Sequence, residues 1–333
     1  MTSFIDNKAT TMVTDENNEA CLEPSWRALL PSACDWCPRR CGANRAAGEK
    51  GFCGADDTMR VARAALHFWE EPPLSGVAGS GAVFFSGCPL RCCFCQNAVI
   101  AADQVGKEVS PERLEQIFFE LRDQGALNIN LVTPTHYASL IARVAMHARR
   151  NGFDLPFVWN TSGYETVEAL HAIAPVADVF LADFKYADSN LARKLSHATD
   201  YPAVALDALD VMIEIAGEPC FDEYHGQLRM THGVVVRHLL LPGHVSESCA
   251  AVELLHKRYG DNVLLSLMNQ YTPVMEASSA AAQKYPELLR APSSEEYEQL
   301  LDFADSLGIE DYFWQEGGAI DESFIPAFDF TGV

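Results

Sequence analysis

The sequence predicts an α/β fold with a parallel sheet, preceded by a small cysteine-rich segment. From residue 82 onward, short β-branched or apolar runs alternate with helical patterns about six times, and each apolar run ends in polar residues. Such alternation is typical of repeated βα units that build a parallel sheet. At 333 residues the chain has room for one large domain with appendages.

Composition divides the chain into three parts. Residues 1–24 are polar and lack a basic n-region followed by an apolar h-region, so we expect a disordered tail without a secretory signal. Residues 25–78 are a cysteine-rich segment and a linker, in which residues 60–78 form an extended connection broken by the proline pair Pro72-Pro73. Residues 79–330 are expected to form the core domain with a C-terminal extension.

Four cysteines stand together ahead of the core, at the spacing C-x2-C-x3-C-x11-C. They are Cys34, Cys37, Cys41 and Cys53. Four thiolates close the coordination of a zinc ion, and they equally satisfy a 4Fe-4S cluster. The spacing therefore predicts a metal site of one of these two kinds, with reduced structural thiols as the alternative.

The core begins with a buried strand at residues 82–85 that leads into a second cysteine group. Cys88, Cys92 and Cys95 are spaced C-x3-C-x2-C. Three thiolates can hold three corners of a 4Fe-4S cluster, whereas the usual site takes four, so one iron is left open for a substrate or cofactor. Cys93 is expected to be a bystander, because exchanging it for Cys92 gives an unusual C-x4-C-x1-C spacing. A zinc knuckle or buried free thiols are the alternatives.

The βα units continue to the end of the core. Ser110 and Pro111 are an N-cap and a first-turn proline, and they open a helix with an apolar stripe. The remaining strands are expected at 128–132, 156–159, 179–182, 234–241 and 263–267. In parallel βα barrels the C-terminal ends of the strands meet over one face, so the polar residues at these ends and the Cys88 loop predict one common site.

Charge and hydropathy exclude several kinds of partner. The chain has 24 Lys and Arg against 46 Asp and Glu, a net charge of -22, which opposes binding to nucleic acid and to anionic lipid. No run of 18 or more apolar residues is present, so no membrane span is expected. Eleven cysteines without a secretory signal indicate a reducing, cytoplasmic location, where clustered thiols are more often metal ligands than disulfides.

Several short motifs resemble the radical S-adenosylmethionine (radical SAM) superfamily. The C-x3-C-x2-C loop resembles the cysteine motif of the superfamily. Other short motifs resemble the PflX-type proteins, which are often labelled pyruvate formate-lyase activating enzyme-like. These motifs are the Cys34 to Cys53 group, Asn130-Leu-Val-Thr-Pro-Thr-His-Tyr137, Asp183-Phe-Lys-Tyr186, Arg237-His-Leu239 and Asn269-Gln-Tyr271. The resemblance covers roughly residues 30 to 330.

The resemblance implies a partial (β/α)6 barrel and a 4Fe-4S cluster whose free iron binds the amino and carboxylate groups of SAM. The reduced cluster would cleave SAM to methionine and a 5′-deoxyadenosyl radical, with a flavodoxin or ferredoxin as reductant. Phe94 matches an aromatic position near the adenine, and Asp183 and Lys185 resemble contacts to methionine or ribose. Further contacts are expected from Asn160, Thr161, Ser162 and Arg237. Many members of the superfamily have a Gly-Gly-Glu motif after the second strand, whereas this chain has Thr133-Pro-Thr135 there, and we expect Thr133 and Thr135 to contact SAM instead.

Two function classes follow. The first is a radical SAM enzyme that attacks a glycine in a partner glycyl-radical enzyme, a peptide or a small molecule. The second is a noncatalytic zinc-binding or redox-sensing protein, in which both cysteine groups hold zinc.

Overall fold

The computed structural model describes residues 29–102, 105–315 and 325–333. The tail expected at 1–24 lies outside the described residues. The strands are β1 (Arg60–His67), β2 (Ser80–Phe85), β3 (Lys107–Glu108), β4 (Ile129–Val132), β5 (Phe157–Thr161), β6 (Val179–Asp183), β7 (Cys220–Tyr224), β8 (Gln227–Leu239), β9 (Leu264–Met268) and β10 (Tyr312–Phe313). The helices are α1 (Pro72–Ser75), α2 (Ala98–Ala101), α3 (Pro111–Asp123), α4 (Ala138–Arg150), α5 (Val167–Ile173), α6 (Ser189–Ser196), α7 (Tyr201–Ala216), α8 (Val245–Tyr259), α9 (Ala280–Lys284) and α10 (Ser294–Ser306).

The strands form a mostly parallel sheet, which confirms the predicted α/β fold. The strand order is β10-β9-β8-β6-β5-β4-β2-β1-β3, and β7 pairs with β8 beside this path. Every pairing from β2 to β10 along the path is parallel. Because parallel neighbours point the same way, the C-terminal ends of the six predicted core strands share one edge of the sheet.

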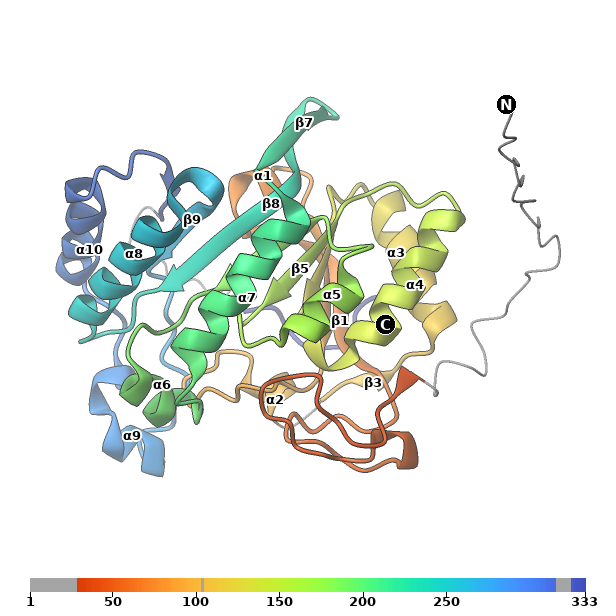
Figure 1. The fold of residues 1–333 in the computed structure, drawn as a ribbon, viewed down its shortest axis with the longest axis horizontal. Helices are drawn as coiled ribbons and strands as arrows, with labels where there is room; N and C mark the ends of the chain where they lie inside the picture. The colour runs from red at the N-terminus through yellow and green to blue at the C-terminus, as the bar shows by residue number, and fades with distance from the viewer. Residues whose placement is uncertain (1–28, 103–104, 316–324) are drawn as a thin grey trace, which may run out of the picture.

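Helices cover the outside of this sheet in chain order. Figure 1 shows α3, α4, α5, α7, α8 and α10 in a row along the sheet, and α3 packs on α4, α4 on α5, α5 on α7, and α8 on α10. Helix α3 begins as predicted, since the Ser110 hydroxyl accepts a hydrogen bond from the Arg113 N–H and Pro111 occupies the first turn. The crossover helices therefore keep the strands parallel and leave their C-terminal edge for other segments.

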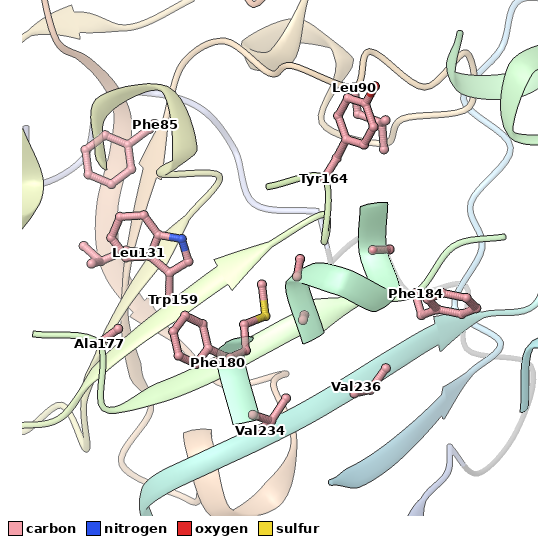
Figure 2. Packing of buried hydrophobic residues seen from close by; sticks show 14 of the residues in the cluster. Phe85, Leu90, Leu131, Trp159, Tyr164, Ala177, Phe180, Phe184, Val234 and Val236 are labelled. Carbon is pink, nitrogen blue, oxygen red and sulfur yellow. The ribbon is translucent and has the colours of Figure 1, made fainter. Parts of the chain in front are cut away.

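The core lies between the helices and the sheet. Figure 2 shows side chains from β2, β4, β5, β6 and β8, among them Phe85, Leu131, Trp159, Phe180 and Val234, gathered in this layer. All five residues of β5 are buried, which is typical of a parallel strand covered on both faces. The continuous apolar runs in the sequence reflect this double burial.

Antiparallel pairing at one edge of the sheet differs from the expectation. Residues 60–67 were expected in an extended connection, but they form β1, which pairs antiparallel with both β2 and β3. Strand β8 also begins earlier than expected, at Gln227, because its first half pairs antiparallel with β7. Because β1 is antiparallel to β2, His67 lies opposite Ser80 at the start of β2. The segment after β1 therefore begins near the N-terminal end of the parallel strands, and the Glu70 side chain reaches Asn130 in β4 and Arg237 in β8.

Candidate functional site

A cavity opens where the parallel strands end. It is lined by all three cysteines of the C-x3-C-x2-C loop and by Phe94 from the same loop. The strand ends contribute Thr133 after β4, Asn160, Thr161 and Ser162 at β5, Asp183 and Lys185 at β6, and Arg237 within β8. The structure thus brings together every residue predicted for the cofactor site except Thr135.

The three loop thiols lie in a setting that suits an iron–sulfur cluster. Burial, together with the neighbouring Cys92 and Cys88 sulfurs, raises the pKa of Cys95 to about 12. The Ser196 hydroxyl donates to Cys92 Sγ at 2.9 Å, and the Leu90 N–H donates to Cys88 Sγ at 3.4 Å. Close sulfurs that receive hydrogen bonds are the arrangement that a bound cluster needs, so the donor set fits the group.

Cys93 is placed differently from its neighbours. Its side chain does not line the cavity, and its backbone N–H donates to the Leu195 carbonyl. Burial raises the pKa of the Cys93 thiol to about 11. This residue therefore holds the loop against α6.

A compact network of charges forms part of the cavity wall. Arg237 donates through Nε to Asp183 at 3.0 Å, through Nη1 to Glu70 at 3.1 Å and through Nη2 to Asn160 at 2.7 Å. Lys185 Nζ lies 2.6 Å from the other Asp183 oxygen. Burial raises the pKa of Asp183, but Lys185 and Arg237 outweigh burial and hold it below its usual range. The wall therefore presents fixed positive and negative groups side by side.

Lys185 links this network to the thiols. Burial raises the pKa of Cys92, while the Lys185 ammonium lowers it. A cysteine must lose its proton to ligate a metal, and a nearby cation favours the thiolate. Lys185 is thus placed to support Cys92 as a ligand.

Thr133 carries local backbone strain at the end of β4. Its φ is +56°, in the left-handed region that β-branched residues rarely adopt. Its N–H donates to the Asn160 carbonyl at 2.9 Å, which ties the ends of β4 and β5 together. Strain of this kind collects at functional sites, where the surrounding structure imposes it.

Thr135 turns away from the cavity. Its side chain is buried, and its hydroxyl donates to Glu165 Oε1 at 2.6 Å. The Thr161 hydroxyl donates to the same oxygen. Burial raises the pKa of Glu165 to about 7, while these two hydroxyls act in the opposite direction. Thr135 therefore positions Glu165 beneath the strand ends.

The four-cysteine segment packs directly against the C-x3-C-x2-C loop. The Cys88 N–H donates to the Cys53 carbonyl at 3.3 Å, and a Cβ on Gly87, whose φ is +96°, would lie 2.8 Å from that carbonyl oxygen. Arg39 donates to the carbonyls of Pro89 at 2.8 Å and Ser196 at 2.8 Å. Only glycine at position 87 permits this approach, so the two cysteine groups form one structural unit.

Within that segment the four thiols differ in exposure. Cys34, Cys37 and Cys53 are buried, whereas Cys41 is exposed. The Cys41 and Cys53 sulfurs both lie near Gly51, since a Cβ there would be 3.3 Å from one and 3.6 Å from the other. Across the described part of the chain, no three His, Cys, Asp or Glu side chains are arranged to hold a metal ion. The metal expected at this group and the cluster expected at Cys88, Cys92 and Cys95 therefore both stay predictions.

Sequence reasoning assigned no role to several residues of the site. Glu70 and His67 line the cavity from the segment that β1 positions, and Gln270 and Tyr271 line it from the loop after β9. Burial lowers the pKa of His67 to about 4, so its ring is neutral at pH 7. The polar motif Asn269-Gln-Tyr271 follows a predicted strand and could have indicated that Gln270 and Tyr271 belong to the site. The sequence around Glu70 contains no such indication.

Comparisons with known proteins place these features in context. Residues 82–241 match the family model of the radical SAM superfamily. An uncharacterized protein of Methanocaldococcus jannaschii is 28% identical over 286 residues, which cover 83% of this chain and 75% of that protein.

Two solved structures are also similar. A radical SAM methyltransferase from Sphaerobacter thermophilus aligns with a TM-score of 0.50 and 15% identity over 72% of this chain and 68% of that chain. Streptococcus suis SuiB bound to S-adenosylmethionine aligns with a TM-score of 0.45 and 14% identity over 69% of this chain and 45% of that chain. Within the described residues no helix is long and apolar enough to cross a membrane.

Proposed function

We propose that the chain is a radical SAM enzyme that cleaves SAM reductively, a proposal supported by the match of residues 82–241 to the family model of the radical SAM superfamily. Cys88, Cys92 and Cys95 would hold a 4Fe-4S cluster with one iron open to SAM. When bound, the reduced cluster supplies the electron that splits SAM into methionine and a 5′-deoxyadenosyl radical, which abstracts hydrogen from a substrate.

One observation carries this proposal. The three loop thiols and the paired charges of Asp183, Lys185 and Arg237 line the same cavity. The amino-acid part of SAM is a zwitterion, and its recognition needs fixed cations for the carboxylate and acceptors for the ammonium. The wall offers both kinds of group within one network, next to three clustered thiols.

Some residues of the site would bind ligands, and others would exclude water. Lys185 favours the Cys92 thiolate and also stands ready for a carboxylate, since its Nζ faces the cavity beside Asp183. Phe94 and Tyr271 are buried, with ring centroids 6.2 Å apart. Their apolar surfaces close the cavity beside the thiols and shield a reactive radical from solvent.

Three finer parts of the proposal extend beyond the cleavage reaction. The substrate is a glycine in a partner glycyl-radical enzyme, a peptide or a small molecule, and the reductant is a flavodoxin or ferredoxin in the cytoplasm. The segment from Cys34 to Cys53 holds a second 4Fe-4S cluster or a zinc ion. Its contact with the loop at Cys53 and Cys88 supports a role for this group in shaping the first site.

Replacing neighbouring cysteines separately tests the proposal. We expect Cys92→Ala to abolish formation of 5′-deoxyadenosine in the reduced, reconstituted protein, because one cluster ligand is lost. Cys93→Ala is the matched control and should keep most of the activity, since its thiol lies outside the cavity lining. Equal losses in the two variants, with iron content measured in parallel, would refute the ligand assignment.

A further inference from the structure

A second cavity adjoins the first on the side away from the thiols. Its volume is about 250 Å³, and the two cavities share Trp69, Glu70, Arg237, Met268 and Gln270 as lining residues. This is room for a ligand much larger than a single water molecule. A group held here would lie next to the contents of the first cavity.

One carboxylate in this second cavity lacks a complete set of partners. Glu71 lines the cavity, is 7% exposed, and its Oε2 has no hydrogen-bond partner among the described residues. Arg237 is the nearby cation, but its three nitrogens already donate to Asp183, Glu70 and Asn160. A buried carboxylate oxygen without a partner is costly, and a ligand that donates to it would remove that cost.

The charges around Glu71 favour a positive ligand. Three carboxylates, on Glu70, Glu71 and Asp183, face two cations, on Arg237 and Lys185. Burial raises the pKa of Glu71, while Arg237 and Ser266 act in the opposite direction. An added cation would offset the excess negative charge and favour the ionised form of Glu71.

Aromatic side chains stand at the edge of the same cavity. Phe68 is 48% exposed and Trp314 is 53% exposed, and both line it. Aromatic faces attract ammonium and guanidinium groups through their quadrupole. Their exposure leaves them free to cover a ligand that reaches Glu71.

We propose that this cavity binds an ammonium or guanidinium group of the substrate, with Glu71 as its counter-ion and Phe68 and Trp314 as its aromatic cover. The proposal deepens the proposed function and rests on it, since the cavity is then the substrate side of the SAM site. It identifies the substrate as an organic cation, whether a small amine or a peptide with a lysine or arginine side chain.

Binding of small cations to the reconstituted, oxidised protein saturated with SAM tests this. The probes are N-acetyl-arginine amide and N-acetyl-lysine amide, and the neutral analogues are N-acetyl-citrulline amide and N-acetyl-norleucine amide. By isothermal titration calorimetry we expect at least one cation to bind ten times or more tightly than its analogue. Equal binding of cations and analogues, or no binding of any probe, would overturn the proposal.

Two variants test whether Glu71 is the residue that binds the cation. Glu71→Gln should weaken the cation at least tenfold and leave the neutral analogue unchanged. Glu298→Gln removes one charge from an exposed helical position and is the control for the overall charge of -22. Unchanged cation affinity in Glu71→Gln, or an equal loss in Glu298→Gln, would contradict the assignment.

Trp314→Leu gives a second test at an exposed position where folding is not at stake. Loss of the aromatic face should weaken the cation about two- to fivefold. An unchanged affinity would remove Trp314 from the proposed site. Because these titrations need no turnover, a protein that binds the cation but forms no 5′-deoxyadenosine would refute the proposed function alone.

Discussion

Replacing Arg237 with glutamine should destabilise the protein more than any exchange of a surface arginine. The Arg237 side chain is 13% exposed and joins Asp183, Glu70 and Asn160 across three strand ends. Removing the guanidinium leaves the carboxylates of Glu70 and Asp183 buried with one fewer cation. Breaking a buried ion pair from one side typically costs roughly 3–5 kcal/mol.

The size of this change can be expressed as a melting temperature. An unfolding entropy of about 2.1 cal/mol/K per residue gives roughly 0.7 kcal/mol/K for a chain of 333 residues. A loss of 3–5 kcal/mol then lowers Tm by about 4–7 °C. We expect this shift by circular dichroism at pH 7, at one scan rate and with matched metal content.

Arg258→Gln is the matched control for this measurement. Arg258 likewise forms an ion pair, donating two hydrogen bonds to the Asp210 carboxylate, but the two side chains are 42% and 46% exposed. Exposed pairs contribute about 0–1 kcal/mol, so Tm should fall by less than about 1.5 °C. If both variants melt within 1 °C of each other, the argument from the buried network is wrong.

Two further predictions concern the helix cap and the second cysteine group. Arg290 and the N–H groups of Ser293 and Gly243 lower the pKa of Glu296 to about 2. The stability that Glu296 contributes is therefore present above its unfolded pKa, about 4.3, and is lost as the pH falls toward 2. Glu296→Gln should lower Tm by about 1–2 °C at pH 7. The difference in Tm between the wild-type protein and the variant should become smaller below pH 4. A difference in Tm that stays constant down to pH 3 would contradict the role of Glu296 in the helix cap. Separately, a Cys34→Ala, Cys37→Ala variant should lose iron or zinc by elemental analysis; unchanged iron with zinc absent throughout would reject the second site.

The sequence was most informative where one physical cause dominated. The core strands are buried on both faces by helices and by the site, so their apolar runs are continuous and easy to recognise. Strand β1 was missed because Arg60 and Arg63 interrupt its apolar pattern and its pairing is antiparallel at the edge. The start of β8 was missed for a similar reason, although the two-residue turn His225-Gly226, with φ values of +51° and +76°, was an available hairpin signal.

The residues of the site also divide into those that the sequence predicted and those that it did not. Strand-end residues such as Asp183 and Lys185 could be predicted, because parallel strands carry their C-terminal residues to one edge. Glu70 and Glu71 could not, because they follow the antiparallel strand β1 and do not end a parallel strand, and Glu70 joins the site through its contacts with Arg237 and Asn130. Thr135 was predicted to contact SAM only because it belongs to the Thr-Pro-Thr-His motif. It lies three residues beyond the end of β4, and its side chain turns toward the core and contacts Glu165.

Anaerobic reconstitution with iron and sulfide, followed by dithionite and SAM, tests the central claim most directly. The thiols of Cys88, Cys92 and Cys95 in one cavity with Asp183, Lys185 and Arg237 predict an iron chromophore and the release of 5′-deoxyadenosine and methionine. A protein that contains zinc, shows no iron chromophore and forms no 5′-deoxyadenosine would contradict it, and would favour a noncatalytic zinc protein instead.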